Sequence, residues 1–179
     1  MDNGMDNILD TYLYESNSLL DQLDEMLVKD EKEGDFSPDD VNEIFRIMHT
    51  IKGSSAMMEF NSLSTIAHHI EDLFFYIRDK GIESLNPGHK RELFDLMFKS
   101  EDYLRSEVGK VESGSPLSDN IDSFSYEINE FLKKISAEKT VPWNRKPRSL
   151  LRFQKPGRMR LPAPGPKAVC FFHISWRKG

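Results

Sequence analysis

The residues best suited to chemistry lie on two neighbouring stretches of the sequence. His49 is followed by Lys52 and Gly53, three and four positions later, so in a helix all three share one face. Gly53 costs the helix about 1 kcal/mol but leaves space beside the imidazole. On the next stretch, His68 and Glu71 are again three apart. A free imidazole nitrogen is a nucleophile near neutral pH, and a carboxylate that accepts the other ring N–H fixes its tautomer.

The spacing of the two stretches predicts that these side chains meet. The turn between them centres near Phe60, from which His49 and Glu71 are equidistant, as are Lys52 and His68. Equidistant residues of an antiparallel helical hairpin lie at the same height, and packed helix axes are about 8–10 Å apart. Glu71 would then orient His49, Lys52 would offset the charge of a phosphoryl group, and His68 would add a hydrogen bond.

Five amphipathic helices are predicted to position this group, because apolar residues recur every three or four positions through the first 137 residues. Asp6 and Ser37 are the predicted caps of the first two helices, the third is predicted to run from about Ser62, and the fourth and fifth are predicted to follow Pro87 and Ser118. The pairs Met57–Met58 and Phe74–Phe75 are expected to pack in the core. We find no alternating strand pattern and no Gly-rich loop before a helix, so an all-α bundle is predicted and nucleotide-binding sheets are disfavoured.

Charge divides the chain into an acidic body and a basic tail. The whole chain of 179 residues carries −6, but residues 139–179 hold eleven Lys or Arg and no acid, which leaves 13 basic against 30 acidic residues in positions 1–138. An acidic body repels phosphate backbones, so nucleic acid is excluded as its partner. The apolar runs are too short for membrane insertion, and the single Cys170 permits no internal disulfide. We therefore expect a cytoplasmic protein.

The tail has a different composition from the body. Six of the nine prolines lie after residue 138, interleaved with Arg and Lys. This predicts two parts, a helical domain at 1–137 and a disordered basic linker or aberrant tail at 138–179. The tail could instead be the product of a shifted reading frame.

Two motifs give the sequence a family resemblance. The segments HTIKGSSA at 49–56 and LSTIAHHIEDL at 63–73 resemble the N-terminal histidine phosphotransfer (HPt) domain of CheA-type chemotaxis kinases. The resemblance spans about residues 5–136 and implies an antiparallel bundle with a four-helix core and a fifth helix. It also implies phosphorylation of His49, support from Lys52 and Glu71, and an auxiliary role for His68. The family often has small residues where this chain has Met57, Met58 and Glu59.

The resemblance implies a phosphoacceptor in a two-component signalling system. His49 would receive phosphate from the ATP-binding domain of a CheA-type kinase and pass it to an aspartate of response regulators such as CheY and CheB. ATP and Mg²⁺ would belong to that kinase domain, and this chain would bind no cofactor. The part of the family that the chain resembles does not include the ATP-binding domain. Whether the chain is part of an enzyme therefore stays open. The chain is expected to be a monomer truncated after the HPt domain.

Two alternatives remain open from the sequence. The chain could be a stand-alone HPt or kinase-docking module that serves other sensor kinases. His49, His68 and Glu71 could also form a divalent metal site, which is disfavoured because a closed site needs four ligands and Lys52 would repel the cation.

Overall fold

The computed structural model describes residues 3–137, and this range is helical throughout apart from its connections. The elements are α1 (Asn3–Glu33), α2 (Pro38–Met57), α3 (Asn61–Lys80), the short 3-10 helix η1 (Ile82–Ser84), α4 (Pro87–Glu112) and α5 (Asp122–Ala137). No strand occurs among these residues, which confirms the predicted all-α class. The predicted tail, 138–179, lies outside the described residues, and the boundary at 137 stays a prediction.

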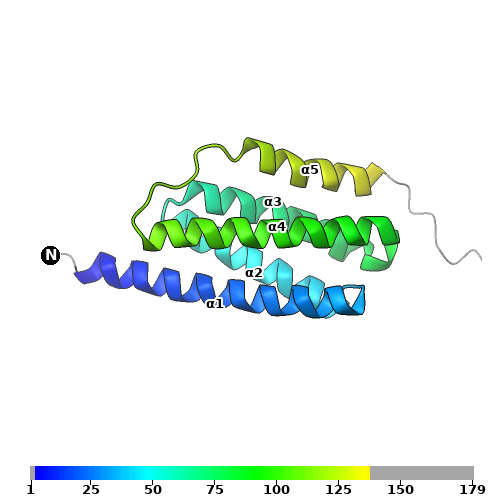
Figure 1. Ribbon diagram of the computed structural model, residues 1–179, viewed down its shortest axis with the longest axis horizontal. Helices are drawn as coiled ribbons and strands as arrows, with labels where there is room; N and C mark the ends of the chain where they lie inside the picture. Colours follow the sequence, from blue (N-terminus) through cyan, green and yellow to red (C-terminus); the bar gives the residue numbers. More distant parts are fainter. Residues whose placement is uncertain (1–2, 138–179) are drawn as a thin grey trace, which may run out of the picture. The chain divides into compact units, whose positions relative to one another are not determined.

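Four helices form the core of the bundle, and the fifth covers one side of it. The contact between α2 and α3 is the most extensive, while α1 packs against α2 and α4, and α3 also packs against α4. Figure 1 shows α5 lying along this group, where it contacts α3. The architecture is therefore the predicted four-helix core with an added fifth helix.

The apolar stripes of all five helices converge on one core. Phe36, in the connection between α1 and α2, also enters it and stacks on Phe94 with ring centroids 4.1 Å apart. Burial of each large apolar side chain contributes about 1.5–3 kcal/mol. Fully buried members include Leu20, Leu23, Leu27, Ile44, Met48, Leu63, Ile70, Phe74, Leu93, Met97, Leu104 and Ile128.

Side-chain caps fix where two of the helices begin. Ser37 Oγ accepts a hydrogen bond from the Asp40 N–H at 3.1 Å and donates one to Asp40 Oδ2 at 2.5 Å. Asn86 accepts from the His89 N–H at 2.9 Å at the start of α4. These caps satisfy backbone donors that a helix start leaves unpaired, so α2 enters the bundle at a defined point.

One predicted helix start was wrong, because α1 already begins at Asn3, before Asp6. Helix α5 follows Ser118 as predicted, but it begins only at Asp122, four positions later. Ser118 has a different role: its N–H and hydroxyl donate to the carboxylate of Glu107 at 2.9 and 2.8 Å. Because Ser118 is hydrogen-bonded to Glu107 of α4, it does not cap α5, and the connection before α5 is not helical.

The predicted core pairs were only half right. Phe74 is fully buried and Met58 packs partly against the core, but Met57 and Phe75 are exposed over 81% and 56% of their surface. Each exposed residue is adjacent to a buried or partly buried one, since successive helical residues are 100° apart around the axis.

The turn between α2 and α3 departs from the small residues expected there. Glu59 adopts a left-handed backbone conformation with φ of 62°, which costs a residue with a Cβ about 1 kcal/mol. The turn is closed by the Phe60 N–H, which donates to the Ser55 carbonyl at 2.9 Å. The Phe60 ring lies 5.1 Å from that of Tyr12, so the turn is anchored to α1.

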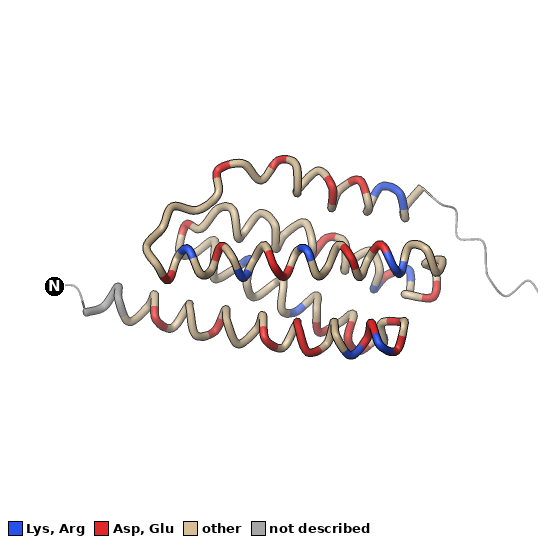
Figure 2. Tube along the Cα trace, viewed as in Figure 1, with Lys and Arg blue, Asp and Glu red and all other residues tan. Residues whose placement is uncertain are grey.

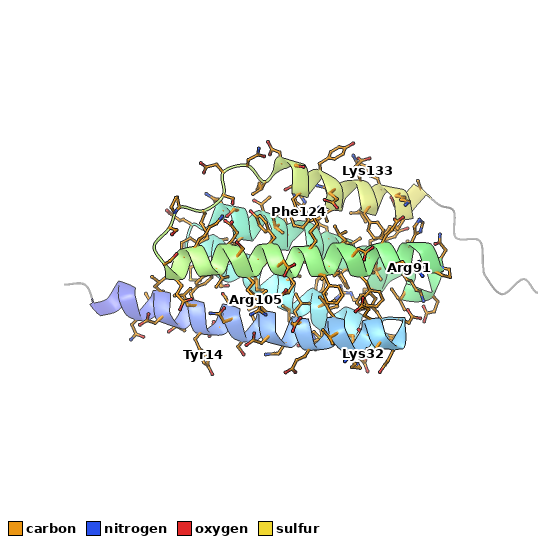
Figure 3. The ribbon with its side chains drawn as sticks, viewed as in Figure 1. Tyr14, Lys32, Arg91, Arg105, Phe124 and Lys133 are labelled. Atoms are coloured by element: carbon orange, nitrogen blue, oxygen red, sulfur yellow. The ribbon has the colours of Figure 1, made fainter. Side chains whose placement is uncertain are left out.

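The surface of the described helices is rich in acidic residues, most visibly along α1 (Figure 2). Figure 3 shows Tyr14 projecting outward from α1, consistent with its 78% exposure. None of the helices in residues 3–137 combines the length and hydrophobicity that a bilayer span requires.

Candidate functional site

Helix α2 presents the predicted nucleophile at the surface. The side chain of His49 is 64% exposed, and that of Lys52 is 29% exposed. A Cβ added to Gly53 would meet nothing within 4 Å, so the helix face beside the imidazole is open. The predicted combination of an accessible ring, a nearby ammonium and free space is present on this helix.

Helix α3 supplies the carboxylate that links these two side chains. Glu71 is buried, and its Oε1 lies 2.8 Å from His49 Nδ1 while its Oε2 lies 2.6 Å from Lys52 Nζ. Burial alone would raise the pKa of Glu71, but the Lys52 ammonium and the His49 ring outweigh it and hold the pKa below its usual range. Glu71 is therefore an ionised acceptor for both partners.

This geometry assigns the proton on the His49 ring. An ionised carboxylate can only accept, so the hydrogen bond at 2.8 Å requires a proton on Nδ1. In the neutral imidazole the lone pair is then on Nε2. No residue in the described part of the chain forms a hydrogen bond or ion pair with Nε2. The structure thus places a free nucleophilic nitrogen at the surface.

His68 does not join this group. Its Nε2 lies 3.6 Å from Asp72 Oδ2, and its ring is 6.1 Å from that of His69. Within residues 3–137 it forms no hydrogen bond or ion pair with His49 or Lys52. The structure therefore brings together His49, Lys52 and Glu71 and leaves the predicted fourth member, His68, outside this group.

The register of the helical hairpin explains this difference. Ser64 Oγ donates to the Lys52 carbonyl at 3.2 Å, so these two residues are level and the hairpin centres near Met58, not near Phe60. His49 is then level with Ala67. Glu71 still reaches the ring because side chains of a helix lean toward its N-terminus, which for α3 is the end near the turn.

An aromatic and cationic group adjoins the imidazole. The Phe45 ring, one turn before His49, lies nearly parallel to the imidazole, with 19° between planes and 6.3 Å between centroids. The Arg78 guanidinium lies over the Phe45 ring at 4.0 Å and within 5.4 Å of the Phe75 ring. The Phe45 side chain is only partly buried, so one side of it faces the surface beside the imidazole. Its position four residues before His49, one helical turn away, was the sequence signal that could have placed Phe45 beside the imidazole.

A metal site does not form from the proposed ligands. No group of three or more His, Cys, Asp or Glu side chains in the described residues is arranged to hold a metal ion. His49 and Glu71 meet, but His68 faces Asp72, and Lys52 occupies the second oxygen of Glu71. The metal interpretation therefore lacks its third ligand.

Comparison with known families decides what this fold is. The Hpt domain family matches residues 7–114. The chain belongs to the Hpt domain family. The CheA resemblance extends this match, because chemotaxis protein CheA of Borreliella burgdorferi is 31% identical over 127 residues, which cover 71% of this chain and 14% of that protein.

Further relatives also match most of this Hpt chain with only a small part of their own length. Sensor histidine kinase CheAY of Helicobacter pylori is 30% identical over 136 residues, covering 74% of the chain and 16% of that protein. CheA of Treponema pallidum is 28% identical over 142 residues, covering 79% and 16% respectively. The Hpt chain thus spans about one sixth of the length of the curated relatives it matches.

A solved structure shares the fold of this Hpt domain. It is the phosphorylated P1 domain of CheA3 in complex with CheY6 from R. sphaeroides, with a TM-score of 0.58 and 23% identity. The match covers 73% of this chain and 97% of that chain. The helical bundle is therefore the architecture of a CheA P1 domain.

Proposed function

We propose that this Hpt chain is the phosphoacceptor of a CheA-type chemotaxis kinase, with His49 Nε2 as the atom that carries the phosphoryl group. The single observation that supports this most is the hydrogen bond between Nδ1 and Glu71, since it leaves the exposed Nε2 with its lone pair. The similarity to CheA proteins and to a phosphorylated P1 domain supports the same assignment.

The proposed reaction needs only this ring and a donor. The Nε2 lone pair attacks the γ-phosphorus of ATP held with Mg²⁺ on a partner kinase domain; the N–P bond forms, the bond to the bridging oxygen breaks and ADP leaves. The ring gains positive charge, which Glu71 stabilises through the Nδ1 proton. Lys52, 2.6 Å from Glu71, would offset the charge of the phosphoryl group.

The second half of the reaction reverses these changes. A response-regulator aspartate attacks the phosphorus, the N–P bond breaks and the neutral Nδ1–H imidazole is restored. CheY-type and CheB-type regulators are the proposed acceptors, and the neighbouring P1 domain in complex with CheY6 supports the first of these. In this proposal the chain works as a cytoplasmic monomer, and His68, three residues before Glu71 on α3, acts as an auxiliary group.

The decisive experiment compares two exposed histidines. Incubation with a CheA-type kinase domain and γ-labelled ATP–Mg²⁺ is expected to give acid-labile, base-stable phosphate that His49→Gln abolishes. His68→Gln is the matched control, because its side chain is 55% exposed against 64% for His49, and it is expected to retain the label. Unchanged labelling of His49→Gln would refute the proposal.

A further inference from the structure

The cluster of Phe45, Phe75 and Arg78 has no part in the proposed transfer, yet it adjoins the reacting ring. Phe45 is on α2, and Phe75 and Arg78 are on α3, so the cluster bridges the two helices that build the site. The Phe45 and Phe75 centroids are 6.4 Å apart with the rings tilted at 45°. Arg78 is exposed and lies over Phe45 at 4.0 Å, within the range of a cation–π contact.

His49 needs more than one contact to stay in a single orientation. The hydrogen bond to Glu71 fixes the position of Nδ1 but leaves the ring able to swing about that bond, because 64% of the side chain is exposed. The nearly parallel Phe45 ring lies beside the imidazole with the two centroids 6.3 Å apart, within the range over which aromatic rings interact. Phe45 thus limits the swing, provided that its own ring is held in place.

We propose that Arg78 is a positioning residue for His49, acting through Phe45. Its guanidinium holds the Phe45 ring against the imidazole, so that Nδ1 stays on Glu71 and Nε2 points outward. The inference rests on the proposed function for its biological meaning, but the ring orientation it predicts can be measured without any partner. Without this contact, the imidazole would sample other rotamers and lose part of its Nδ1–H population.

The first test measures the tautomer directly. In ¹⁵N-labelled full chain at a pH where the ring is neutral, the ¹⁵N shifts of His49 are expected to report mainly the Nδ1–H form. Arg78→Ala should move the shifts toward a mixture of both tautomers, and Arg78→Lys should restore them in part, since it keeps a cation. Arg46→Ala is the matched control, because Arg46 is also exposed and one turn from His49 but pairs with Glu43. It should leave the tautomer unchanged.

The second test measures the reactivity of Nε2 with phosphoramidate. Nε2 attacks the phosphorus, the N–P bond of the reagent breaks and ammonia leaves, while the Nδ1 proton stays on the ring. Arg78→Ala should slow labelling of His49 about three- to fivefold, with an unchanged far-UV circular dichroism spectrum. Arg46→Ala should retain the original rate, which excludes a general effect of charge.

A double-mutant cycle separates action through Phe45 from other effects. Phe45→Leu should slow labelling as much as Arg78→Ala, and the pair should be no slower than either single variant. The proposal is overturned if Arg78→Ala keeps the original tautomer and rate, if Arg46→Ala behaves like it, or if the two substitutions are additive. Loss of kinase-dependent labelling alone would refute the proposed function and leave the tautomer result intact.

Discussion

At the scale of single residues, Glu71 is the group that makes His49 distinctive. One oxygen accepts from Nδ1 at 2.8 Å, and the other pairs with Lys52 at 2.6 Å, so one carboxylate orients both the ring and the ammonium. Its pKa is held below the usual range against the effect of burial, which keeps it ionised at neutral pH. A neutral side chain of the same shape cannot serve both partners in this way.

Glu71→Gln is expected to slow the labelling of His49 by phosphoramidate about tenfold. The amide can turn its NH₂ toward Nδ1, which favours the tautomer with the proton on Nε2, and its oxygen then accepts from Lys52 without the negative charge that paired with the ammonium. Asp72→Asn is the control, because this neighbouring carboxylate is 55% exposed and lies near His68. Equal rates for Glu71→Gln and the original chain would show that the carboxylate has no role in reactivity.

The site was only partly predictable from spacing. The predicted contact between His49 and Glu71 is present, but the hairpin register is set by side-chain packing and by the Ser64–Lys52 hydrogen bond, which local spacing does not encode. For the same reason His68 was placed too close to Lys52. The Arg78 contact was missed because it joins positions on different helices, and no short motif marks such a pair.

At the scale of helices, the junction of α1 and α2 brings a buried aspartate near a partly buried one. Asp30 is fully buried, and Lys29 Nζ lies 3.4 Å from Asp30 Oδ1 and 2.9 Å from Asp40 Oδ2. Burial, and then the charge of Asp40, raise the pKa of Asp30 to about 6. The folded chain thus binds the Asp30 proton more tightly than the unfolded chain, in which the pKa of an aspartate is about 3.9.

Asp30→Asn is expected to stabilise the fold at high pH. Because the folded pKa is raised, the free energy of unfolding of the original chain falls as the pH rises from about 4 to 6, where ionisation in the folded state becomes costly. The variant should therefore be more stable by about 2 kcal/mol at pH 8, and the gap should narrow toward pH 4.5. Urea unfolding of both chains between pH 4.5 and pH 8 measures this difference in the free energy of unfolding.

A matched substitution controls for loss of charge on α1. Asp24→Asn removes an exposed carboxylate from the same helix, and we expect only a small change in the free energy of unfolding. A gap between Asp30→Asn and the original chain that stays constant from pH 4.5 to pH 8 would contradict the assignment.

Helix starts were predictable where the capping residue contacts only its own helix. Ser37 and Asn86 bond to the N–H groups three residues later, so the local pattern contains the whole interaction. Ser118 has the same sequence character, but Glu107 of α4 takes its N–H and hydroxyl. A long-range partner therefore competes with the local capping signal, and α5 starts four positions after Ser118.

At the scale of the whole described bundle, α5 contributes stability away from the site. Ile128, Phe131 and Ile135 are buried, and Tyr76 of α3 donates to the Ile135 carbonyl at 3.4 Å. Lys134 also reaches Glu92 of α4 at 2.6 Å. Among the described residues, no hydrogen bond or ion pair joins α5 to His49, Lys52 or Glu71.

Ile128→Ala is expected to lower the free energy of unfolding by about 2–4 kcal/mol, because it leaves a cavity under α5. At a temperature where the variant is folded, the rate of His49 labelling by phosphoramidate should be unchanged. Tyr126→Ala is the control on the same helix; its side chain is 64% exposed, so unfolding should change little. A large loss of labelling in folded Ile128→Ala would show that α5 supports the site.

The fold class was predictable because each of the five segments has an apolar face that only another helix can cover. Beyond the predicted hairpin of α2 and α3, the sequence did not indicate which helices are neighbours: α1 packs against α2 and α4, while α3 also contacts α5. That choice depends on how the stripes fit one another, as Phe36 illustrates by entering the core from a connection.

The open helix face beside Gly53 bears on the lifetime of a phosphoryl group on His49. A Cβ at this position would meet no other side chain within 4 Å, and the His49 side chain is 64% exposed, so water as well as a partner can approach this face. If His49 carries a phosphoryl group as proposed, we expect the isolated chain to lose it by hydrolysis at about the rate of a free phosphohistidine. The lifetime of the group in the proposed cycle would then depend on the partner that binds this face.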